Sequence, residues 1–319
     1  MPASMVRPKI SPLGAVRRNS SSRGRLPTGP VAWVWTWYGL LAMWVVAKPF
    51  RRWVLLASIV LLGVSAFLAF YPRSVLVEIA PSGSGRVFLL RLPHFSSVLV
   101  NTGPREHSRE LIRWLRQRGI NRLGALVLGR SGSDYTGAAG EVLQAVRVRE
   151  LWCVPARTPE DILASARQRG VVIRALAAGQ QGHLPRAVEW EVLWPLSVAN
   201  RTRRADENSV VLRFMRGTQS LLLMNGAGEK TMEALLSLPV NPAATALAAS
   251  PSAATNRLGQ AWRDAVGARD IFISDDTTEG YVPKSLLDEW NGCGYRVRRM
   301  EEPAAPPMEL EEHPAGNGR

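Results

Sequence analysis

The 319-residue sequence predicts an α/β domain built as a four-layer αββα sandwich and preceded by one or two transmembrane helices. Three observations lead to this prediction: two long uncharged apolar runs lie near the N-terminus, two groups of short apolar strands follow them, and each group continues into alternating helices and strands. Two sheets packed face to face, with helices outside, would bury the apolar residues of both groups. A single doubly wound sheet is the alternative, but the succession of strands over 75–101 fits it poorly.

The net charge of +14 is concentrated at the N-terminus. Residues 1–71 contain nine Lys and Arg and no Asp or Glu, so the rest of the chain is only mildly basic. A domain that binds nucleic acid over its whole surface would be basic throughout. The two cysteines, Cys153 and Cys293, are too few for a disulfide-rich scaffold or a Cys-rich zinc module.

The N-terminal part divides into an arm and a membrane region. Residues 1–30 are rich in Ser, Pro, Gly and Arg without apolar periodicity, which predicts a disordered basic arm. Residues 31–71 form the membrane region, in which 53–71 is an uncharged run of about the length that crosses a bilayer as a helix. The run over 31–47 is shorter and rich in Trp, so it predicts either a second span or a helix lying in the interface.

The domain over 72–301 shows both kinds of periodicity, and residues 302–319 are Pro-rich and acidic, which predicts a disordered tail. Short apolar or β-branched runs bounded by Gly, Ser or Pro predict strands, and apolar residues three or four apart predict helices. In chain order we expect strands at 75–80, 87–92 and 97–101, a helix at 106–118, a strand at 125–129, a helix at 137–147, a strand at 151–154, a helix at 159–169, strands at 171–176, 188–194, 209–215 and 220–225, a helix at 228–237, a strand at 245–249, a helix at 256–266, a strand at 270–274, a helix at 284–291 and a strand at 294–299.

The order and spacing of several stretches resemble the metallo-β-lactamase-like domain at the C-terminus of ComEC-type competence proteins, which are inner-membrane channels for DNA uptake. The matching stretches include EIAPSGSGRVFLLRLP, SVLVNTG, LGALVLGRSGSDYTGAAGEVL, ENSVVLRFMRGTQSLLLMNGAGE and FISDDTTEGYVPKSLLDEW. The resemblance implies the metallo-β-lactamase-like fold and a place in the bacterial inner membrane, with the soluble domain on the extracytoplasmic side. It also implies the membrane itself, and DNA or a membrane protein of the same apparatus, as partners.

The resemblance implies a metal site that this sequence does not preserve. Active members of the fold hold zinc or manganese with a His-x-His-x-Asp-His turn and further His and Asp ligands, and the metal lowers the pKa of a bound water. In the corresponding turn this chain keeps only Asp134, which we expect to act instead as a helix N-cap. The other positions where ligands are expected carry Asn101, Arg130, Gly132, Tyr135, Gly226, Ser250, Pro251 and Val282.

We therefore expect no catalytic residue, no metal and no nucleotide or other cofactor, and a binding or structural role for the domain. Two alternatives stay open: a metal-dependent hydrolase, of the phosphodiesterase or nuclease kind, that uses Asp134 with Asp275 and Asp276, and a decayed fragment of a longer DNA-uptake channel. Basic side chains could contact DNA phosphates. The candidates are Arg109, Arg113, Arg116, Arg203 and Arg204.

Overall fold

The computed structural model describes most of the soluble part of the chain and a short piece before it. The described residues are 75–80, 87–92, 96–196, 209–249, 259–273, 282–299 and 308–310, with several residues between 52 and 63.

The chain forms two compact units, Met1–Phe70 and Tyr71–Arg319. In the first unit the described residues are helical, and five large apolar side chains are exposed: Trp53, Leu55, Leu56, Ile59 and Val60. Among the residues that the structure describes, none of the helices combines the length and apolarity needed to cross a bilayer. The arm, the run over 31–47 and much of 53–71 lie outside the described residues.

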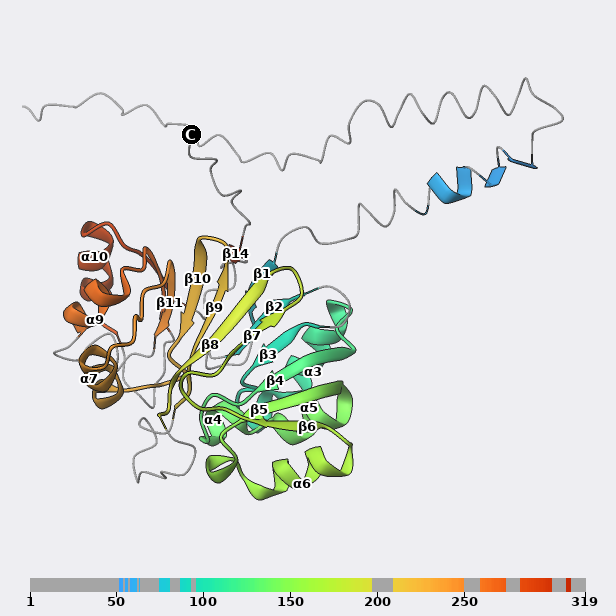
Figure 1. The fold of residues 1–319 in the computed structure, drawn as a ribbon, viewed down its shortest axis with the longest axis horizontal. Helices are drawn as coiled ribbons and strands as arrows, with labels where there is room; N and C mark the ends of the chain where they lie inside the picture. The colour runs from blue at the N-terminus through green and yellow to red at the C-terminus, as the bar shows by residue number, and fades with distance from the viewer. Residues whose placement is uncertain are drawn as a thin grey trace, which may run out of the picture. The chain divides into compact units, whose positions relative to one another are not determined.

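The first sheet of the second unit has seven strands in the order β14-β1-β2-β3-β4-β5-β6 (Figure 1). β1 to β3 form an antiparallel meander, as predicted, and β3 to β6 run parallel. Its strands are β1 (Val75–Ile79), β2 (Phe88–Arg91), β3 (Val98–Val100), β4 (Arg122–Val127), β5 (Arg147–Cys153), β6 (Val172–Ala175) and β14 (Met308–Leu310).

The second sheet also has seven strands, in the order β13-β12-β11-β10-β9-β8-β7. β7 to β10 pair antiparallel and β10 to β13 pair parallel, which repeats the plan of the first sheet. Its strands are β7 (Gln181–Leu184), β8 (Val188–Trp194), β9 (Val211–Arg216), β10 (Gln219–Leu223), β11 (Ala246–Ala249), β12 (Asp270–Ile273) and β13 (Arg296–Arg299).

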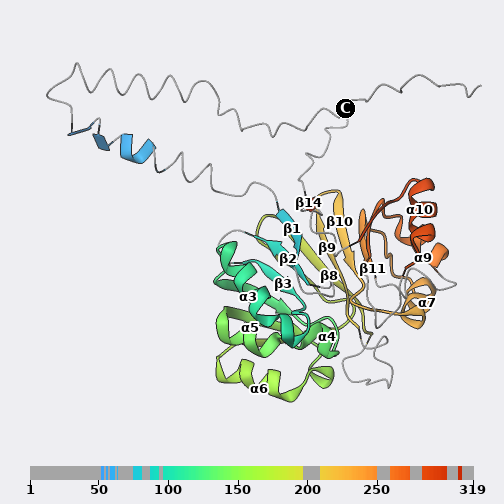
Figure 2. The same ribbon diagram turned by 180° about the vertical axis from the view of Figure 1, so that it is seen from behind.

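Helices cover the outer face of each sheet (Figures 1 and 2). α3, α5 and α6 pack on the first sheet through one apolar cluster, and α7, α9 and α10 pack on the second through two others. The helices are α3 (Ser108–Gln117), α4 (Ser133–Thr136), α5 (Ala139–Ala145), α6 (Glu160–Gln168), α7 (Glu229–Ser237), α9 (Gly259–Val266) and α10 (Lys284–Gly292), with 3₁₀ turns η2 (Arg105–His107) and η3 (Pro155–Arg157).

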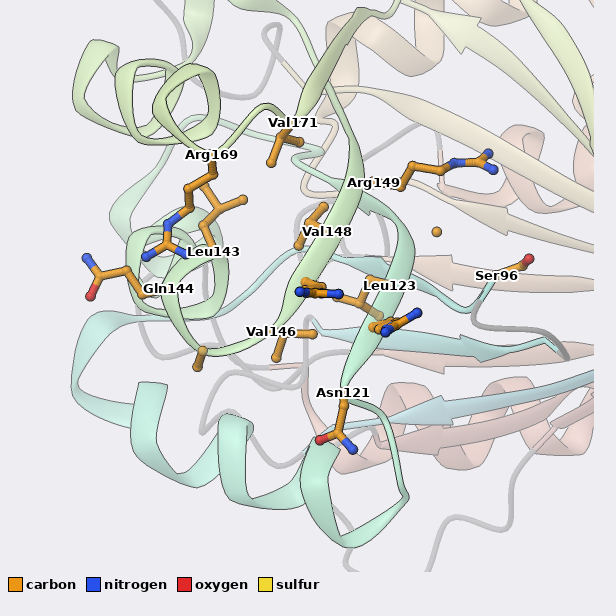
Figure 3. A pocket seen from close by; sticks show the side chains of 14 residues that line it. Ser96, Asn121, Leu123, Leu143, Gln144, Val146, Val148, Arg149, Arg169 and Val171 are labelled. Atoms are coloured by element: carbon orange, nitrogen blue, oxygen red, sulfur yellow. The ribbon is translucent and has the colours of Figure 1, made fainter.

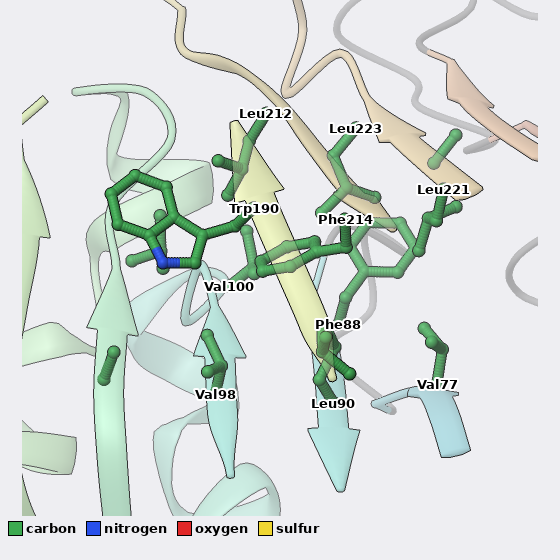
Figure 4. Packing of buried hydrophobic residues seen from close by; sticks show 14 of the residues in the cluster. Val77, Phe88, Leu90, Val98, Val100, Trp190, Leu212, Phe214, Leu221 and Leu223 are labelled. Atoms are coloured by element: carbon green, nitrogen blue, oxygen red, sulfur yellow. The ribbon is translucent and has the colours of Figure 1, made fainter. Parts of the chain in front are cut away.

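The main core lies between the two sheets (Figure 4). Phe88 and Val100 from the first sheet meet Trp190 and Phe214 from the second, and all four are buried. The rings of Trp152 and Trp190 lie 4.5 Å apart, centroid to centroid, and join the sheets near one side of the sandwich. The predicted four-layer αββα sandwich is confirmed, and the alternative of a single doubly wound sheet is wrong.

Two edge strands were not predicted. β14 comes from the tail that was expected to be disordered, and it pairs with β1 through Val75 and Leu310. Leu310 is fully buried, so the apolar side chains of an otherwise acidic segment complete the sheet. β7 has the sequence QGHL, which lacks the apolar alternation of a half-buried strand.

Candidate functional site: a closed network at the strand ends

The carboxyl ends of strands from both sheets meet at one place. Asn101 follows β3, Gly129 and Arg130 follow β4, and Asn225 follows β10. The sheets are tied here by the backbone, since the N–H of Val210 donates to the carbonyl oxygen of Gly129 at 2.6 Å. This is the place where the resemblance put a metal site.

Two buried asparagines form the centre of the site. Asn101 and Asn225 have φ values of 62° and 48°, the left-handed region that Asn tolerates better than most residues. The Nδ2 of Asn101 donates to the Oδ1 of Asn225 at 2.9 Å, and the Nδ2 of Asn225 donates to the carbonyl oxygen of Val210 at 2.8 Å. The Oδ1 of Asn101 accepts the N–H of Gly129 at 2.9 Å. The two amides therefore bind each other and the two sheets.

Two glycines make room for these side chains. A Cβ on Gly129 would lie 2.4 Å from the Cγ of Asn225, so only glycine allows the amide to sit against the strand end. Gly226 has a φ of 75°, and a Cβ there would lie 2.3 Å from both the Nη1 of Arg130 and the Oη of Tyr135. The space at the strand ends is thus filled by amide, guanidinium and phenol groups.

Arg130 brings a positive charge to this network. Its Nη1 donates to the carbonyl oxygen of Gly226 at 3.3 Å and, at the longer distance of 3.5 Å, to the Oη of Tyr135. Its Cζ lies 5.1 Å from the centroid of the Tyr135 ring, within the range of a cation–π contact. Tyr135 is buried, so the side chain that replaces an expected histidine belongs to the core.

Asp134 does not act as the predicted helix cap. The N-cap of α4 is Gly132, and Asp134 lies inside the first turn of the helix. A Cβ on Gly132 would lie 2.3 Å from the Oδ1 of Asp134, so the carboxylate folds back over the glycine that precedes it. The N-cap prediction is wrong because the helix begins two residues earlier than expected.

The remaining predicted positions are dispersed. Val282 is buried in the cluster of α10, β12 and β13, and its carbonyl oxygen accepts a hydrogen bond from the Nη2 of Arg299 at 2.9 Å. It therefore lies in an apolar core. Outside the described residues lie Ser250, Pro251, Arg203, Arg204, Asp275 and Asp276.

The donor set at the strand ends does not fit zinc or manganese. These ions are held by several imidazole, thiolate or carboxylate ligands. The described strand-end side chains are two neutral amides already bonded to each other, a phenol, a guanidinium and a single carboxylate, that of Asp134. The guanidinium of Arg130 would also repel a cation placed beside it. Within the described part of the chain, no three His, Cys, Asp or Glu side chains gather where they could hold a metal ion.

The sequence prediction assigned the site position to Gly226 and missed Asn225, which makes the central contact. A signal for it was present, because an Asn–Gly pair directly after a strand indicates a tight turn with left-handed residues. What the sequence could not show is that Asn225 meets Asn101, which is 124 residues away along the chain.

Three of the predicted DNA contacts lie together on α3. Arg109, Arg113 and Arg116 are exposed and follow the i, i+4, i+7 spacing that places them on one face of the helix. The opposite face buries Leu111 and Leu115 against the first sheet. We call the three exposed residues the α3 arginine stripe.

The two seven-stranded sheets and their outer helices form the four-layer αββα order that the sequence predicted. The sequence matches no protein-family model and no curated protein. Its structure is similar to the metallo-β-lactamase fold protein YhfI from Bacillus subtilis, with a TM-score of 0.47, 11% identity and coverage of 71% of this chain and 96% of that one.

Two further solved structures show the same likeness. CmlA, a diiron β-hydroxylase from Streptomyces venezuelae, has a TM-score of 0.46 and 11% identity over 71% of this chain, which spans 52% of CmlA. Zn²⁺-bound PqqB from Methylobacterium extorquens has a TM-score of 0.43 and 13% identity, covering 71% and 97% of the two chains. All three TM-scores lie below 0.5, and the four-layer fold is defined by the chain's own two sheets and the core between them.

Proposed function

We propose that this chain is a membrane-anchored protein whose metallo-β-lactamase-like domain binds a partner and does not catalyse metal-dependent hydrolysis. One observation carries the proposal: at the strand ends, Asn101 and Asn225 bind each other across the two sheets while Arg130 lies against Gly226. A hydrolase of this fold needs an open metal there, with a water made acidic by it. Neutral amides, a guanidinium and the single carboxylate of Asp134 do not supply the three or four ligands that such a metal needs.

A phosphodiesterase assay tests the loss of catalysis. The full chain, supplied with excess Zn²⁺ or Mn²⁺, should hydrolyse bis(p-nitrophenyl) phosphate no faster than its Asp134→Asn variant. The comparison is informative because of the position of Asp134. Among the described positions where the resemblance puts metal ligands, Asp134 is the one that still carries a residue able to bind a metal ion. Metal-dependent hydrolysis that Asp134→Asn abolishes would favour the open alternative of a hydrolase using Asp134 with Asp275 and Asp276.

The anchor is the second part of the proposal. It is supported by the uncharged run over 53–71 and by the described helical residues within it, whose large apolar side chains are exposed. We place the anchor in the bacterial inner membrane, with the domain on the extracytoplasmic side. Resistance of the full chain to carbonate extraction tests the anchor, and a reporter fused to the C-terminus tests the side. Release of the chain by carbonate would contradict the membrane anchor. A reporter active only in the cytoplasm would contradict the extracytoplasmic position of the domain.

DNA is the ligand that we propose for the α3 arginine stripe, in keeping with the resemblance to DNA-uptake proteins; a membrane protein of the same apparatus is the alternative partner. Three guanidinium groups on one helix face suit the spacing of phosphates along a strand. Fluorescence anisotropy with the full chain in detergent should show DNA binding that weakens steeply between about 50 and 200 mM salt. The variant Arg109→Gln/Arg113→Gln/Arg116→Gln should reduce it at least about fivefold. Absence of binding at low salt would rule out DNA.

A further inference from the structure

The edge of the first sheet that is opposite the strand-end network carries a basic pocket. β1 and β3 are both antiparallel to β2, and β3, β4 and β5 are parallel, so the amino ends of β1, β3, β4 and β5 share one edge. A pocket of about 1060 Å³ opens at the start of β4 and β5 (Figure 3). Its lining includes no Asp or Glu and four arginines, which we call the arginine pocket: Arg122, Arg147, Arg149 and Arg169.

The strand register brings like charges together in this pocket. Arg122 of β4 lies directly opposite Arg147 of β5 in the parallel pair, so two guanidinium groups start from neighbouring positions at this edge. Arg149 is paired with Glu150 at 2.9 Å, so its charge is shared with a carboxylate outside the lining. Arg169 is exposed after the last turn of α6.

The shape of the pocket favours an extended array of phosphates. Figure 3 shows Arg149 and Arg169 on opposite sides of the strand between them, so the positive charges are spread around the pocket. The lining contains Leu, Val, Ala and Gly but no aromatic residue. Single-stranded nucleic acids are usually held by aromatic side chains that stack on bases, so this lining does not favour them.

The chain reaches the first sheet at this same edge. β1 begins at Val75, four residues after the end of the apolar run over 53–71, and a linker of that length spans at most about 14 Å. Strands in a sheet lie about 4.8 Å apart, so the starts of β4 and β5 lie about 14 and 19 Å from that of β1. The proposed membrane span and the first strand of this edge are thus separated by only three residues of chain, 72–74.

We infer that the arginine pocket binds the phosphate groups of anionic phospholipids in the membrane that anchors the chain. Guanidinium groups bind phosphate through paired hydrogen bonds, and basic residues near an anionic bilayer are attracted to it over about one Debye length. The inference rests on the proposed anchor. Lipid contact would orient the domain so that the α3 arginine stripe and the strand ends are held at a defined height above the bilayer.

The test uses the full chain in lipid nanodiscs with a fluorophore at the pocket. Gln144 lines the pocket and is exposed, so the label is placed at Gln144→Cys in a Cys293→Ser background, where the remaining Cys153 is buried. Discs of phosphatidylcholine alone are compared with discs that also contain phosphatidylglycerol, each with a trace of headgroup spin-labelled lipid. Quenching should be at least about twofold stronger in the anionic discs at 50 mM salt and should fall at 500 mM salt.

The α3 arginine stripe provides a charge-matched control. Arg122→Gln/Arg147→Gln/Arg169→Gln should remove the extra quenching, whereas Arg109→Gln/Arg113→Gln/Arg116→Gln should leave it. If the first variant fails to fold, as judged by circular dichroism, Arg169→Glu alone should still reduce the quenching. Equal quenching in both kinds of disc, or equal losses in both triple variants, would overturn the inference.

Two further outcomes distinguish the lipid inference from the proposals of DNA binding and of a membrane anchor. If duplex DNA shields the label in phosphatidylcholine discs while phosphatidylglycerol has no effect, the pocket binds nucleic acid and the lipid inference is wrong. If carbonate extracts the chain from membranes, the anchor proposal fails. The same chain would then be tested by flotation with anionic vesicles. Flotation that is lost in the pocket variant and kept in the stripe variant would support lipid binding by the arginine pocket without the anchor.

Discussion

At the scale of single residues, the chemistry of the site depends on which neutral groups replace charged ones. Asn101 and Asn225 have nearly the same shape as aspartates, but each amide can donate as well as accept. This lets them bind each other directly, where two carboxylates would repel and require a cation between them. Gly129 is the residue that makes the contact possible, because its missing side chain leaves space for the amide of Asn225.

We predict that Gly129→Ala destabilises the domain by about 2–4 kcal/mol, because the new Cβ displaces an amide that is held by buried hydrogen bonds. Gly140→Ala is the matched control. Gly140 lies in α5 with nothing within 4 Å of an added Cβ, so alanine should stabilise the helix by about 0.5–1 kcal/mol. Urea denaturation of both variants measures the difference. A neutral effect of Gly129→Ala would show that the asparagine pair is not rigid.

At the scale of elements, the sequence predicted best where apolar patterns are strong. Helices α3, α6, α7 and α10 were predicted within one or two residues at most ends, because each buries one apolar face. The edge strands β7 and β14 were missed, because a strand that pairs on one side needs little apolar sequence of its own. The sheet order and the meeting of β3 with β10 at the site depend on contacts between distant segments, which local patterns do not record.

In β5, the carboxylate of Glu150 links Trp152, which lies in the core between the two sheets, to two arginine side chains. Glu150 accepts hydrogen bonds from the indole N–H of Trp152 at 2.7 Å, from Arg149 at 2.9 Å and from Arg174 at 3.1 Å. Burial alone would raise the pKa of Glu150, but the Trp152 hydrogen bond and the charges of Arg174 and Arg149 outweigh it, so the pKa lies below its usual value. The ring of Trp152 in turn packs against that of Trp190 in the other sheet, tilted by 43°.

We predict that Glu150→Gln destabilises the domain near neutral pH and that this cost disappears in acid. A carboxyl group with a lowered folded-state pKa contributes stability above its unfolded pKa of about 4.3, and this contribution is lost as pH falls through the folded-state value. The free energies of unfolding of wild type and variant should therefore differ at pH 7, and the difference should shrink as the pH falls below about 4.3. A difference that is constant from pH 7 to pH 3 would contradict the role of the charge.

The strand β14 gives a second prediction at this scale. The Nη1 of Arg216, a buried residue of β9, donates to the carbonyl oxygen of Leu310 at 2.6 Å, so β14 joins both sheets. A chain ending at Pro307 should lose about 2–4 kcal/mol of stability, because Leu310 leaves the core and Arg216 loses a buried partner. A chain ending at Glu312 keeps β14 and is the control. Equal thermal stability of the two truncated chains would contradict the prediction.

At the scale of the whole domain, the two opposite edges of the first sheet have different characters. The carboxyl edge, where the resemblance predicted a metal site, is filled by amides and a guanidinium that hold the sheets together. The amino edge is open and carries the arginine pocket, and the chain reaches the sheet there. The arginines of the pocket thus lie at the surface of the amino edge, whereas the side chains at the carboxyl edge are bonded to each other and to both sheets.

Elemental analysis of the purified full chain tests the central claim, the absence of a metal site at the strand ends. The protein is incubated with excess Zn²⁺ or Mn²⁺, freed of unbound ions by gel filtration and compared with Asp134→Asn treated in the same way. We predict less than about 0.1 equivalent of metal in both proteins, because a stable site needs three or more His, Cys or carboxylate ligands. About one equivalent in the wild type, lost in Asp134→Asn, would contradict the account.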